Sequence, residues 1–334
     1  NKTPLIIRIN VLFFPSPEKS LTLSVRALKQ LNTDEKINRA KKAVSRMYTD
    51  SDGDVCLRLA NGRCPMLNDN NLCEIYIDMG KDALCDVCKN YPRFFKESKN
   101  CIIAGLSVSC PEVASIILSD NSDKIIQDLS FADENEIIFF EIYNLVTSII
   151  YESDFLNCDF EKLEFASDEF IFNREMFCTD VVRKSFEKHL CDYSADFAKK
   201  AICTLSDLEF LTGEWQEVWN RFKIHISKCG TSQGHLIETG SFFADLQKSG
   251  EIKNFAVYFL YKYLWEAIED ESIDLWIKRA YVATRLVCEL CCSEFFNHEN
   301  ATNETIARLC RLLCKEFEHN EDNLAVFEDF CCEI

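Results

Sequence analysis

The chain has 334 residues, of which 47% are apolar, with 26 phenylalanines but only 9 glycines and 6 prolines. This composition excludes disorder over most of the chain and favours a helix-rich protein with one large body and a smaller module, or two domains. The formal net charge of -18 repels phosphate backbones, so we expect no nucleic-acid partner. The acidity serves solubility in the simplest interpretation, and it would also favour a basic partner.

The 19 cysteines indicate a reducing compartment, and we therefore expect a cytoplasmic protein. Their number is odd, and many stand singly in apolar, helix-like segments rather than in a compact disulfide framework. The first residues are partly apolar, but Arg8 and Asn10 interrupt them and no small-residue cleavage site follows, which disfavours a signal peptide. Because the chain begins at Asn1 rather than methionine, it could be a fragment or a trimmed product.

Residues 1–54 form the first predicted region, an N-terminal segment with one amphipathic helix. A short extended run covers 5–14, and the helix would begin at Thr33 or Asp34. Its apolar face would carry Ile37, Ala40, Val44 and Met47, at spacings of three and four. The opposite face is basic, which predicts a solvated surface or, as the sharper alternative, contact with an acidic partner.

Residues 55–119 are predicted to form a small cysteine-rich module with short β-hairpin elements. Between Cys64 and Glu112 the sequence places six cysteines beside turn residues and prolines. Asparagine-glycine at 61–62 predicts a tight turn before Cys64, and a second turn at 68–71 precedes Cys73. The two turns should bring Cys64 and Cys73 near each other.

Four cysteines of this module are the predicted metal ligands: Cys64, Cys73, Cys88 and Cys110. Each lies at a turn, a proline junction or the edge of a short element. Cys110 precedes Pro111 at the start of a predicted helix, where the helix dipole and free amides favour the thiolate. Four thiolates suit either tetrahedral zinc or a 4Fe-4S cluster, and their spacing does not choose between them.

Cys85 and Cys101 are reserve ligands in the same stretch. A short helix is predicted over 75–88 with an interruption near Gly80, and Pro92 prevents its continuation. An extended piece at 105–109 should lead into Cys110. The alternative for all six cysteines is packing as small, reduced hydrophobic side chains.

Residues 120–334 are predicted to form a helical domain, so the expected fold class is mainly α. The apolar run at 135–151 predicts a buried central helix, which is too short and too charged to span a membrane. We therefore expect no membrane partner. Further amphipathic helices are predicted at 168–190, 192–211, 214–228, 255–270, 274–296, 303–318 and 322–332.

Five cysteines of the helical domain are predicted to pack in its core rather than to bind metal: Cys288, Cys291, Cys292, Cys310 and Cys314. The polar segment 119–133 is the predicted seam before this domain, and the loop 229–240 is its predicted mobile element. The sequence contains no glycine-rich nucleotide loop, Walker loop or serine nucleophile elbow, so catalytic residues stay unknown.

Four motifs follow one another in the cysteine-rich module. They are C-P-x-L at 64–67, L-C-x-I at 72–75, C-K-x-Y-P-R at 88–93 and L-S-x-S-C-P-E at 106–112. In this order and with these gaps they resemble the flagellin lysine-N-methylase family, which is related to cysteine-rich zinc- or iron-chelating proteins. The resemblance covers roughly one sixth of the chain.

The resemblance implies transfer of methyl groups from S-adenosylmethionine to lysine side chains of flagellin by an enzyme that carries an iron–sulfur cluster. It implies Cys64, Cys73, Cys88 and Cys110 as cluster ligands. Arg93 and Glu112 would support the cofactor site. Arg93 could donate hydrogen bonds to cluster sulfurs or to the methyl donor's carboxylate, or form an ordinary salt bridge. Glu112 could instead only stabilise the N-terminus of its helix.

Members of that family also carry a cysteine-dense segment near their N-terminus, whereas residues 1–55 of this chain contain no cysteine. The alternative function is therefore a non-enzymatic zinc- or iron–sulfur-binding protein with a structural or interaction role, as a truncated or divergent relative.

Overall fold

The computed structural model describes about three fifths of the chain. The described residues are 38, 41, 45, 47–49, 55–57, 64–70, 72–84, 86–97, 100–119, 132, 134–152, 196–229, 242–243, 245–246, 248–267, 273–298 and 302–333. They are mainly helical, as predicted, with ten α-helices and two two-stranded sheets. The chain divides into a smaller compact unit, Val11–Phe94, and a larger one that includes Phe95–Ile334. The predicted boundaries at 54 and 119 stay predictions.

The smaller unit contains an antiparallel pair of short strands, β1 (Met47–Thr49) and β2 (Val55–Leu57), in which Tyr48 lies opposite Cys56. Asn38 and Lys41 are helical, but Met47 begins a strand, so the predicted helix was extended too far. Aromatic and β-branched residues at 48, 49 and 55 favour extended backbone. The expected turn at 61–62 lies outside the described residues.

The predicted interruption of the helix at 75–88 is confirmed. Helix α3 (Glu74–Met79) ends at Gly80, a short 3-10 turn η1 covers Lys81–Ala83, and α4 (Asp86–Asn90) follows. Gly80 has a φ of 80°, a backbone conformation that glycine adopts without the steric penalty of a Cβ atom.

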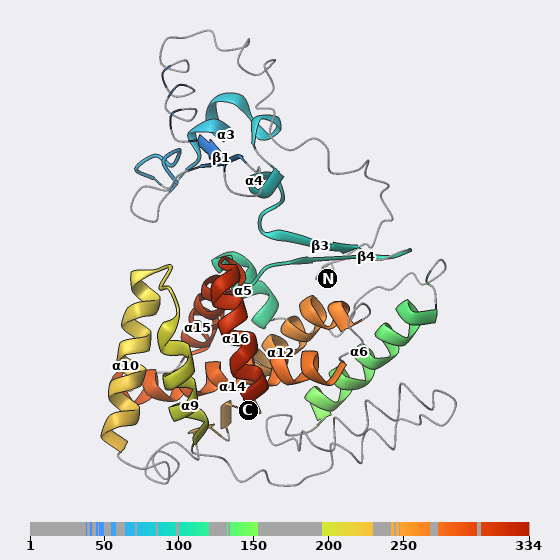
Figure 1. The fold of residues 1–334 in the computed structure, drawn as a ribbon, viewed down its shortest axis with the longest axis vertical. Coiled ribbons are helices and arrows are strands. Elements are labelled where there is room, and N and C mark those ends of the chain that lie inside the picture. The colour runs from blue at the N-terminus through green and yellow to red at the C-terminus, as the bar shows by residue number, and fades with distance from the viewer. Residues whose placement is uncertain are drawn as a thin grey trace, which may run out of the picture. The chain divides into compact units, whose positions relative to one another are not determined.

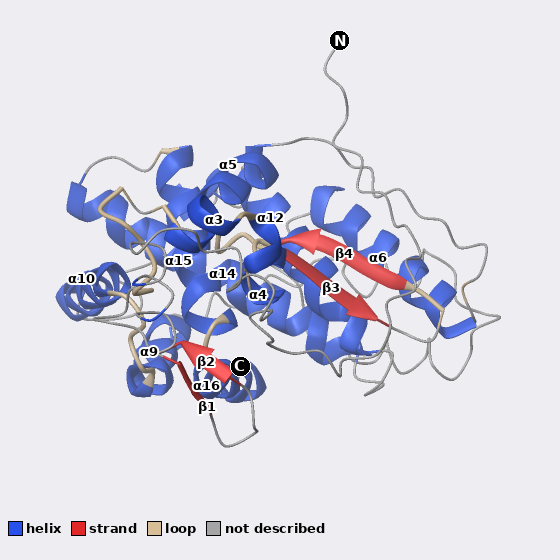
Figure 2. Cartoon of the chain, turned by 90° about the horizontal axis from the view of Figure 1, so that it is seen from above, coloured by secondary structure: helices blue, strands red, loops and turns tan. Residues whose placement is uncertain are grey.

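Strands β3 (Arg93–Glu97) and β4 (Ile102–Leu106) pair in a second sheet, and Figure 2 shows their arrows pointing in opposite directions. The extended piece expected at 105–109 is therefore shifted: the strand ends at Leu106, and a turn leads to Cys110. Helix α5 (Pro111–Ser119) then begins at the predicted proline.

The larger unit is built from helices at nearly all the predicted places (Figure 1). They are α6 (Glu134–Glu152), α9 (Asp196–Thr204) with η4 (Leu205–Asp207), α10 (Gly213–Cys229), α12 (Gly250–Tyr263) with η5 (Leu264–Glu266), α14 (Ile273–His298), α15 (Asn303–Glu318) and α16 (Glu321–Glu333). The helix predicted at 168–190 lies outside the described residues, as do nearly all of the seam 119–133 and of the loop 229–240.

Helix α14, rather than α6, is the central helix of this unit. It contacts α9, α10, α12, α15 and α16, and its described side chains from Arg279 to Glu294 are all buried. Helix α6 instead exposes one side with Ile137, Glu141 and Asn144. The expectation that 135–151 forms the buried central helix was wrong: α6 keeps an exposed side, whereas the charged residues of α14 are paired, as Arg285 is with Glu289, and can therefore be buried.

Aromatic side chains fill much of the core around α14. Trp215 stacks on Trp219 with ring centroids 5.7 Å apart, and Phe317 stacks on Phe327 at 4.5 Å. Phe317 also meets Trp215 edge-on at 6.3 Å, so aromatic contacts join α10, α15 and α16 and use several of the phenylalanines. Within the described part of the chain, no helix combines the length and the apolarity that crossing a bilayer requires.

Candidate functional site

Two linked turns hold Cys64 and Cys73 in the smaller unit. The amide of Leu67 donates to the carbonyl of Cys64 at 3.2 Å, and Leu67 forms an isolated β-bridge with Cys73. The Asn68 side-chain oxygen accepts hydrogen bonds from the amides of Asn70 at 2.9 Å and Leu72 at 3.0 Å. The predicted proximity of the two cysteine-bearing segments is therefore confirmed at the level of the backbone.

The remaining predicted residues of the smaller unit lie at or near the ends of short elements. Cys88 is exposed on α4, whereas Cys64 and Cys73 are partly exposed. Arg93 is exposed at the first position of β3. Cys85 lies outside the described residues. The three described cysteines are thus accessible to a ligand or a reagent.

Cys110 belongs to the larger unit, where its backbone is fixed on both sides. Its amide donates to the carbonyl of Ser107 at 3.2 Å, and its carbonyl accepts from the amide of Ala114 at 2.9 Å in the first turn of α5. Its side chain is partly exposed. Glu112 is exposed in the same helical turn, where a carboxylate favours the helix N-terminus.

The reserve ligand Cys101 is buried just ahead of β4. Its amide donates to a carboxylate oxygen of Glu136 at 3.1 Å, and the same oxygen accepts from the amide of Asn100 at 2.9 Å. Glu136, on α6, is fully buried. Helix α6 thereby holds the segment that enters β4.

Among the residues that the structure describes, no three histidine, cysteine, aspartate or glutamate side chains are gathered as a metal ion would require. The ligand assignment to Cys64, Cys73, Cys88 and Cys110, with Arg93 and Glu112 as supporting residues, therefore stays a prediction.

A buried polar cluster lies beneath the turn that carries Cys110, and we call it the Glu318 node: Ser107, Tyr258, Lys262 and Glu318. The carboxylate of Glu318 accepts hydrogen bonds from the hydroxyls of Ser107 at 2.8 Å and Tyr258 at 3.0 Å. Lys262 forms an ion pair with it at 2.6 Å. These donors reach both carboxylate oxygens, Tyr258 at Oε1 and Ser107 and Lys262 at Oε2. A carboxylate paired with a lysine is ionised and can only accept hydrogen bonds.

The hydrogen bonds of the node run in one direction toward Glu318. Ser107 has one hydroxyl proton and donates it to Glu318, so the hydroxyl of Ser109, 2.8 Å away, donates to Ser107. The Nε2 atom of His319 lies 3.2 Å from the same Ser109 hydroxyl and must donate to it. Partial burial lowers the pKa of His319, which favours the neutral ring, and the bond to Ser109 then places the ring proton on Nε2.

Helix α12 adds two further bonds to the segment that leads into Cys110. The amide of Val108 donates to the hydroxyl of Tyr258 at 3.2 Å, and the hydroxyl of Tyr261 donates to the carbonyl of Ala104 in β4 at 3.1 Å. Burial, with the nearby charge of Glu318, raises the pKa of Tyr258, and burial raises that of Tyr261. Both phenols therefore keep the proton that they donate.

The sequence did not reveal the node. Ser107, Val108 and Ser109 belong to the L-S-x-S-C-P-E motif, but nothing in the motif indicates partners 150 to 211 residues away. In the sequence, Tyr258 and Tyr261 are candidate polar groups for a methylase, but their periodicity equally suggests an aromatic core. The one available signal is Lys262, a cation in the middle of an otherwise apolar and aromatic run.

The five cysteines predicted as core residues are confirmed as buried. Cys288, Cys291 and Cys292 lie on α14, and Cys310 and Cys314 lie on α15. Burial raises the pKa of every one of these thiols. They are neutral packing residues at physiological pH.

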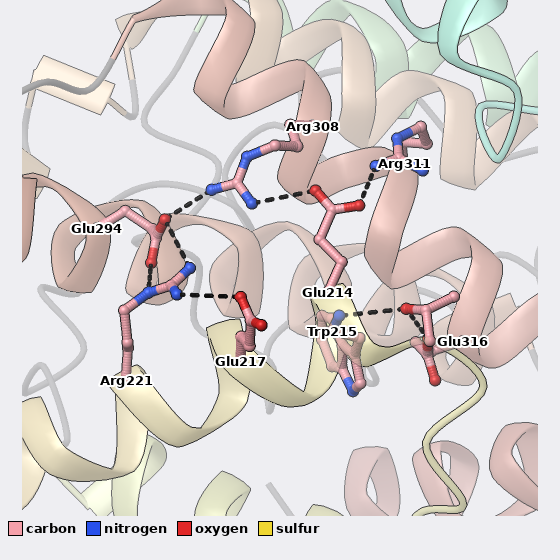
Figure 3. A network of polar contacts seen from close by, with 9 residues as sticks. Glu214, Trp215, Glu217, Arg221, Glu294, Arg308, Arg311 and Glu316 are labelled. Carbon is pink, nitrogen blue, oxygen red and sulfur yellow. Dashed lines mark hydrogen bonds and ion pairs between the residues drawn. The ribbon is translucent and has the colours of Figure 1, made fainter.

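A second ionic network joins helices α10, α14 and α15 (Figure 3). Glu294 accepts from Arg221 Nε at 2.7 Å and pairs with Arg308 at 2.6 Å, while Glu214 pairs with Arg308 and Arg311. Burial opposes ionisation of Glu294, but its arginine partners outweigh burial and hold its pKa below the ordinary value. This network ties helices to one another and contains none of the predicted site residues.

Known proteins resemble this chain over a short segment. A stretch of 68 residues is 40% identical to the flagellar biosynthetic protein FliU of Salmonella muenchen and covers 20% of this chain and 40% of that protein. The same identity over 68 residues relates it to the lysine-N-methylases of Salmonella typhimurium and Salmonella choleraesuis, of which 17% is covered. The match thus spans less than half of each relative and shows a distant relation.

No protein-family model matches the chain, and no solved structure does.

Proposed function

We propose that this protein is an S-adenosylmethionine-dependent methylase that modifies lysine side chains of flagellin. The observation that carries the proposal is the 68-residue match to proteins named lysine-N-methylase. The name of the third relative, a flagellar biosynthetic protein, supports a flagellar substrate. The acidic chain would also suit a substrate segment that presents lysines.

In this proposal Cys64, Cys73, Cys88 and Cys110 hold a 4Fe-4S cluster, with zinc as the alternative. Their thiolate chemistry fits either group, and none of the four side chains is buried. The buried cysteines of α14 and α15 fit less well, since burial raises their pKa and disfavours the thiolate. A bound cluster would supply a rigid thiolate-ligated centre that orders the cysteine-bearing turns.

The proposed reaction is a direct methyl transfer. The neutral ε-amine of a flagellin lysine attacks the sulfonium methyl group; the new nitrogen–carbon bond forms as the carbon–sulfur bond breaks. The electron pair of that bond stays on sulfur, which leaves as the thioether of S-adenosylhomocysteine. The amine must lose a proton beforehand to a base or water, because free lysine is protonated at pH 7. Arg93, a fixed cation with several donors, is the proposed partner of the donor's carboxylate.

The short extent of the match supports a second candidate function, metal binding without methyl transfer. Because it covers only 17% of each lysine-N-methylase, the shared segment could be a metal-binding element used without methyl transfer. In that case the chain is a zinc- or iron–sulfur-binding interaction protein.

Anaerobic purification followed by iron, zinc and sulfide analysis, and by a methylation assay with flagellin from the same source, distinguishes the two candidates. Methylated lysines detected by peptide mass spectrometry, together with about four irons per chain, support the methylase with its cluster. One bound zinc and no methylated lysine support the interaction protein.

Two cysteine variants test the ligand assignment in the same preparation. Cys88→Ala should remove the visible absorbance of a cluster, whereas Cys203→Ala, at an exposed cysteine of α9, should keep it. Equal metal content in both variants would show that Cys88 is not a ligand.

A further inference from the structure

We propose that Glu318 is a positioning residue for Cys110: anchored by Lys262 and Tyr258, it fixes the Ser107–Ser109 turn so that the Cys110 thiolate is oriented for metal binding. This inference rests on the metal-ligand role proposed for Cys110. It concerns a residue on α15, more than 200 positions further along the chain.

Each of the three residues that precede Cys110 is tied to the node or to its neighbour His319. Ser107 donates to Glu318 at 2.8 Å, and the amide of Val108 donates to Tyr258 at 3.2 Å. Ser109 contacts His319 at 3.2 Å. With the backbone of Cys110 already bonded to Ser107 and Ala114, the turn has little freedom left.

Burying the Lys262–Glu318 ion pair costs free energy. The side chains of Lys262 and Glu318 are only 10% and 4% exposed. A buried ion pair gains little stability over well-packed apolar side chains, because desolvation of both charges offsets their attraction. Stability alone therefore does not account for the pair. What the pair provides is a buried acceptor for the hydroxyls of Ser107 and Tyr258, which an apolar replacement could not supply.

The arrangement matches what metal-binding residues require from their surroundings. Hydrogen-bonded partners outside the ligand set orient the ligands, and their loss typically weakens metal binding by about 10- to 100-fold. Here the partners bond the backbone and hydroxyls beside Cys110, while its side chain stays partly exposed. The thiol is thus held in place and is still available to a metal.

Two variants of the 334-residue chain remove contacts of the node at different points. Ser107→Ala removes only the hydroxyl of the turn and leaves the ion pair, whereas Glu318→Gln removes the charge that anchors the node. Glu294→Gln is the matched control, because the Glu294 side chain is 5% exposed and also binds two cationic partners, yet it holds no turn.

Two measurements on the metal-free protein read out the position of Cys110. Amide hydrogen exchange at 108–110 should become roughly fivefold faster or more in Ser107→Ala and Glu318→Gln, the factor expected for a lost hydrogen bond. Titration with Co²⁺, followed by the thiolate-to-cobalt charge-transfer bands, should show about 10- to 100-fold weaker binding. Glu294→Gln should change neither, even where it lowers the melting temperature.

Unchanged exchange and unchanged cobalt affinity in Ser107→Ala would overturn the positioning role, as would equal changes in Glu294→Gln. Wild-type protein without thiolate-to-cobalt bands would overturn it too, because Cys110 would then not serve as a ligand. Failure of flagellin methylation alongside the expected cobalt response would overturn the proposed activity and leave the positioning role standing.

Discussion

The chain uses cysteine in two different ways. The motif cysteines, Cys64, Cys73, Cys88 and Cys110, lie at turns or on short helices and are exposed or partly exposed. The core cysteines, Cys288, Cys291, Cys292, Cys310 and Cys314, lie within the long helices α14 and α15 and are fully buried. The same side chain is thus a candidate ligand in one region and an apolar packing unit in the other.

The difference follows from where secondary structure begins and ends. A cysteine before the first turn of a helix, such as Cys110, has free amides and solvent nearby. A cysteine in the middle of a buried helix, such as Cys310, is surrounded by side chains whose low polarity disfavours the thiolate and raises its pKa. The number of cysteines alone therefore says little about metal binding.

Reactivity should separate the two groups most strongly. In the native, metal-free protein, iodoacetamide should modify the motif cysteines at least about a thousandfold faster than the core cysteines. The core thiols become accessible only on unfolding, which costs 5 kcal/mol or more in a typical domain. Peptide mapping of samples taken over time measures both rates. Similar rates for Cys110 and Cys310 would contradict the division.

The effect of substitution on stability should separate the motif cysteines from the core cysteines by a smaller but measurable margin. Cys310→Ser is expected to lower the free energy of unfolding by about 1–3 kcal/mol, because it buries a hydroxyl where the thiol packed as an apolar group. Cys110→Ser should change it by no more than about 0.5 kcal/mol in the metal-free protein. Urea denaturation measures both values, and a larger loss for the Cys110 variant would reverse the assignment of the two groups.

Alkaline pH provides the most specific test, with the smallest effect for any single thiol. Burial raises the pKa of each core thiol above its ordinary value of 9.0, so above that pH only the unfolded chain loses these protons. Stability should be fully present below pH 9 and fall as the pH rises, by about 1 kcal/mol per core thiol between pH 9 and 10.

The variant Cys291→Ala removes one of these groups and should flatten the dependence of the unfolding free energy on pH. Cys203→Ala, at an exposed cysteine, is the control and should keep the slope of the wild type. Equal slopes for wild type and Cys291→Ala would mean that this buried thiol ionises alike in the folded and unfolded states. The buried tyrosines add a similar effect only above their ordinary pKa of 10.0.

Local signals in the sequence predicted much of the fold. Pro111 marked the start of α5, and Gly80 marked the break after α3, because each residue acts through its own backbone geometry. The amphipathic periods located α10, α14, α15 and α16 within a few residues. Regular spacing and local backbone preference are properties that a single segment carries.

Partners distant in the chain could not be predicted in this way. Helix α14 can lie at the centre because its charged side chains are paired, as Arg279 is with Glu328 at 3.1 Å. In the sequence alone, such charges are typical of an exposed helix face. The Glu318 node likewise joins the turn after β4 to α12 and α15 through single side chains. The periodicity of a sequence does not say which buried charged residues pair with each other. The motif around Cys110 could therefore be found in the sequence, but the Glu318 node that holds it could not.

The contact between Glu136 and the segment before β4 affects the order in which contacts form during synthesis of the chain. The amides of Asn100 and Cys101 leave the ribosome 36 and 35 residues before the carboxylate that receives them. Until α6 has been synthesised and has docked, these two amides have to be satisfied by water. These two hydrogen bonds therefore form only after β3 and β4 have been synthesised, and a chain truncated before α6 lacks them.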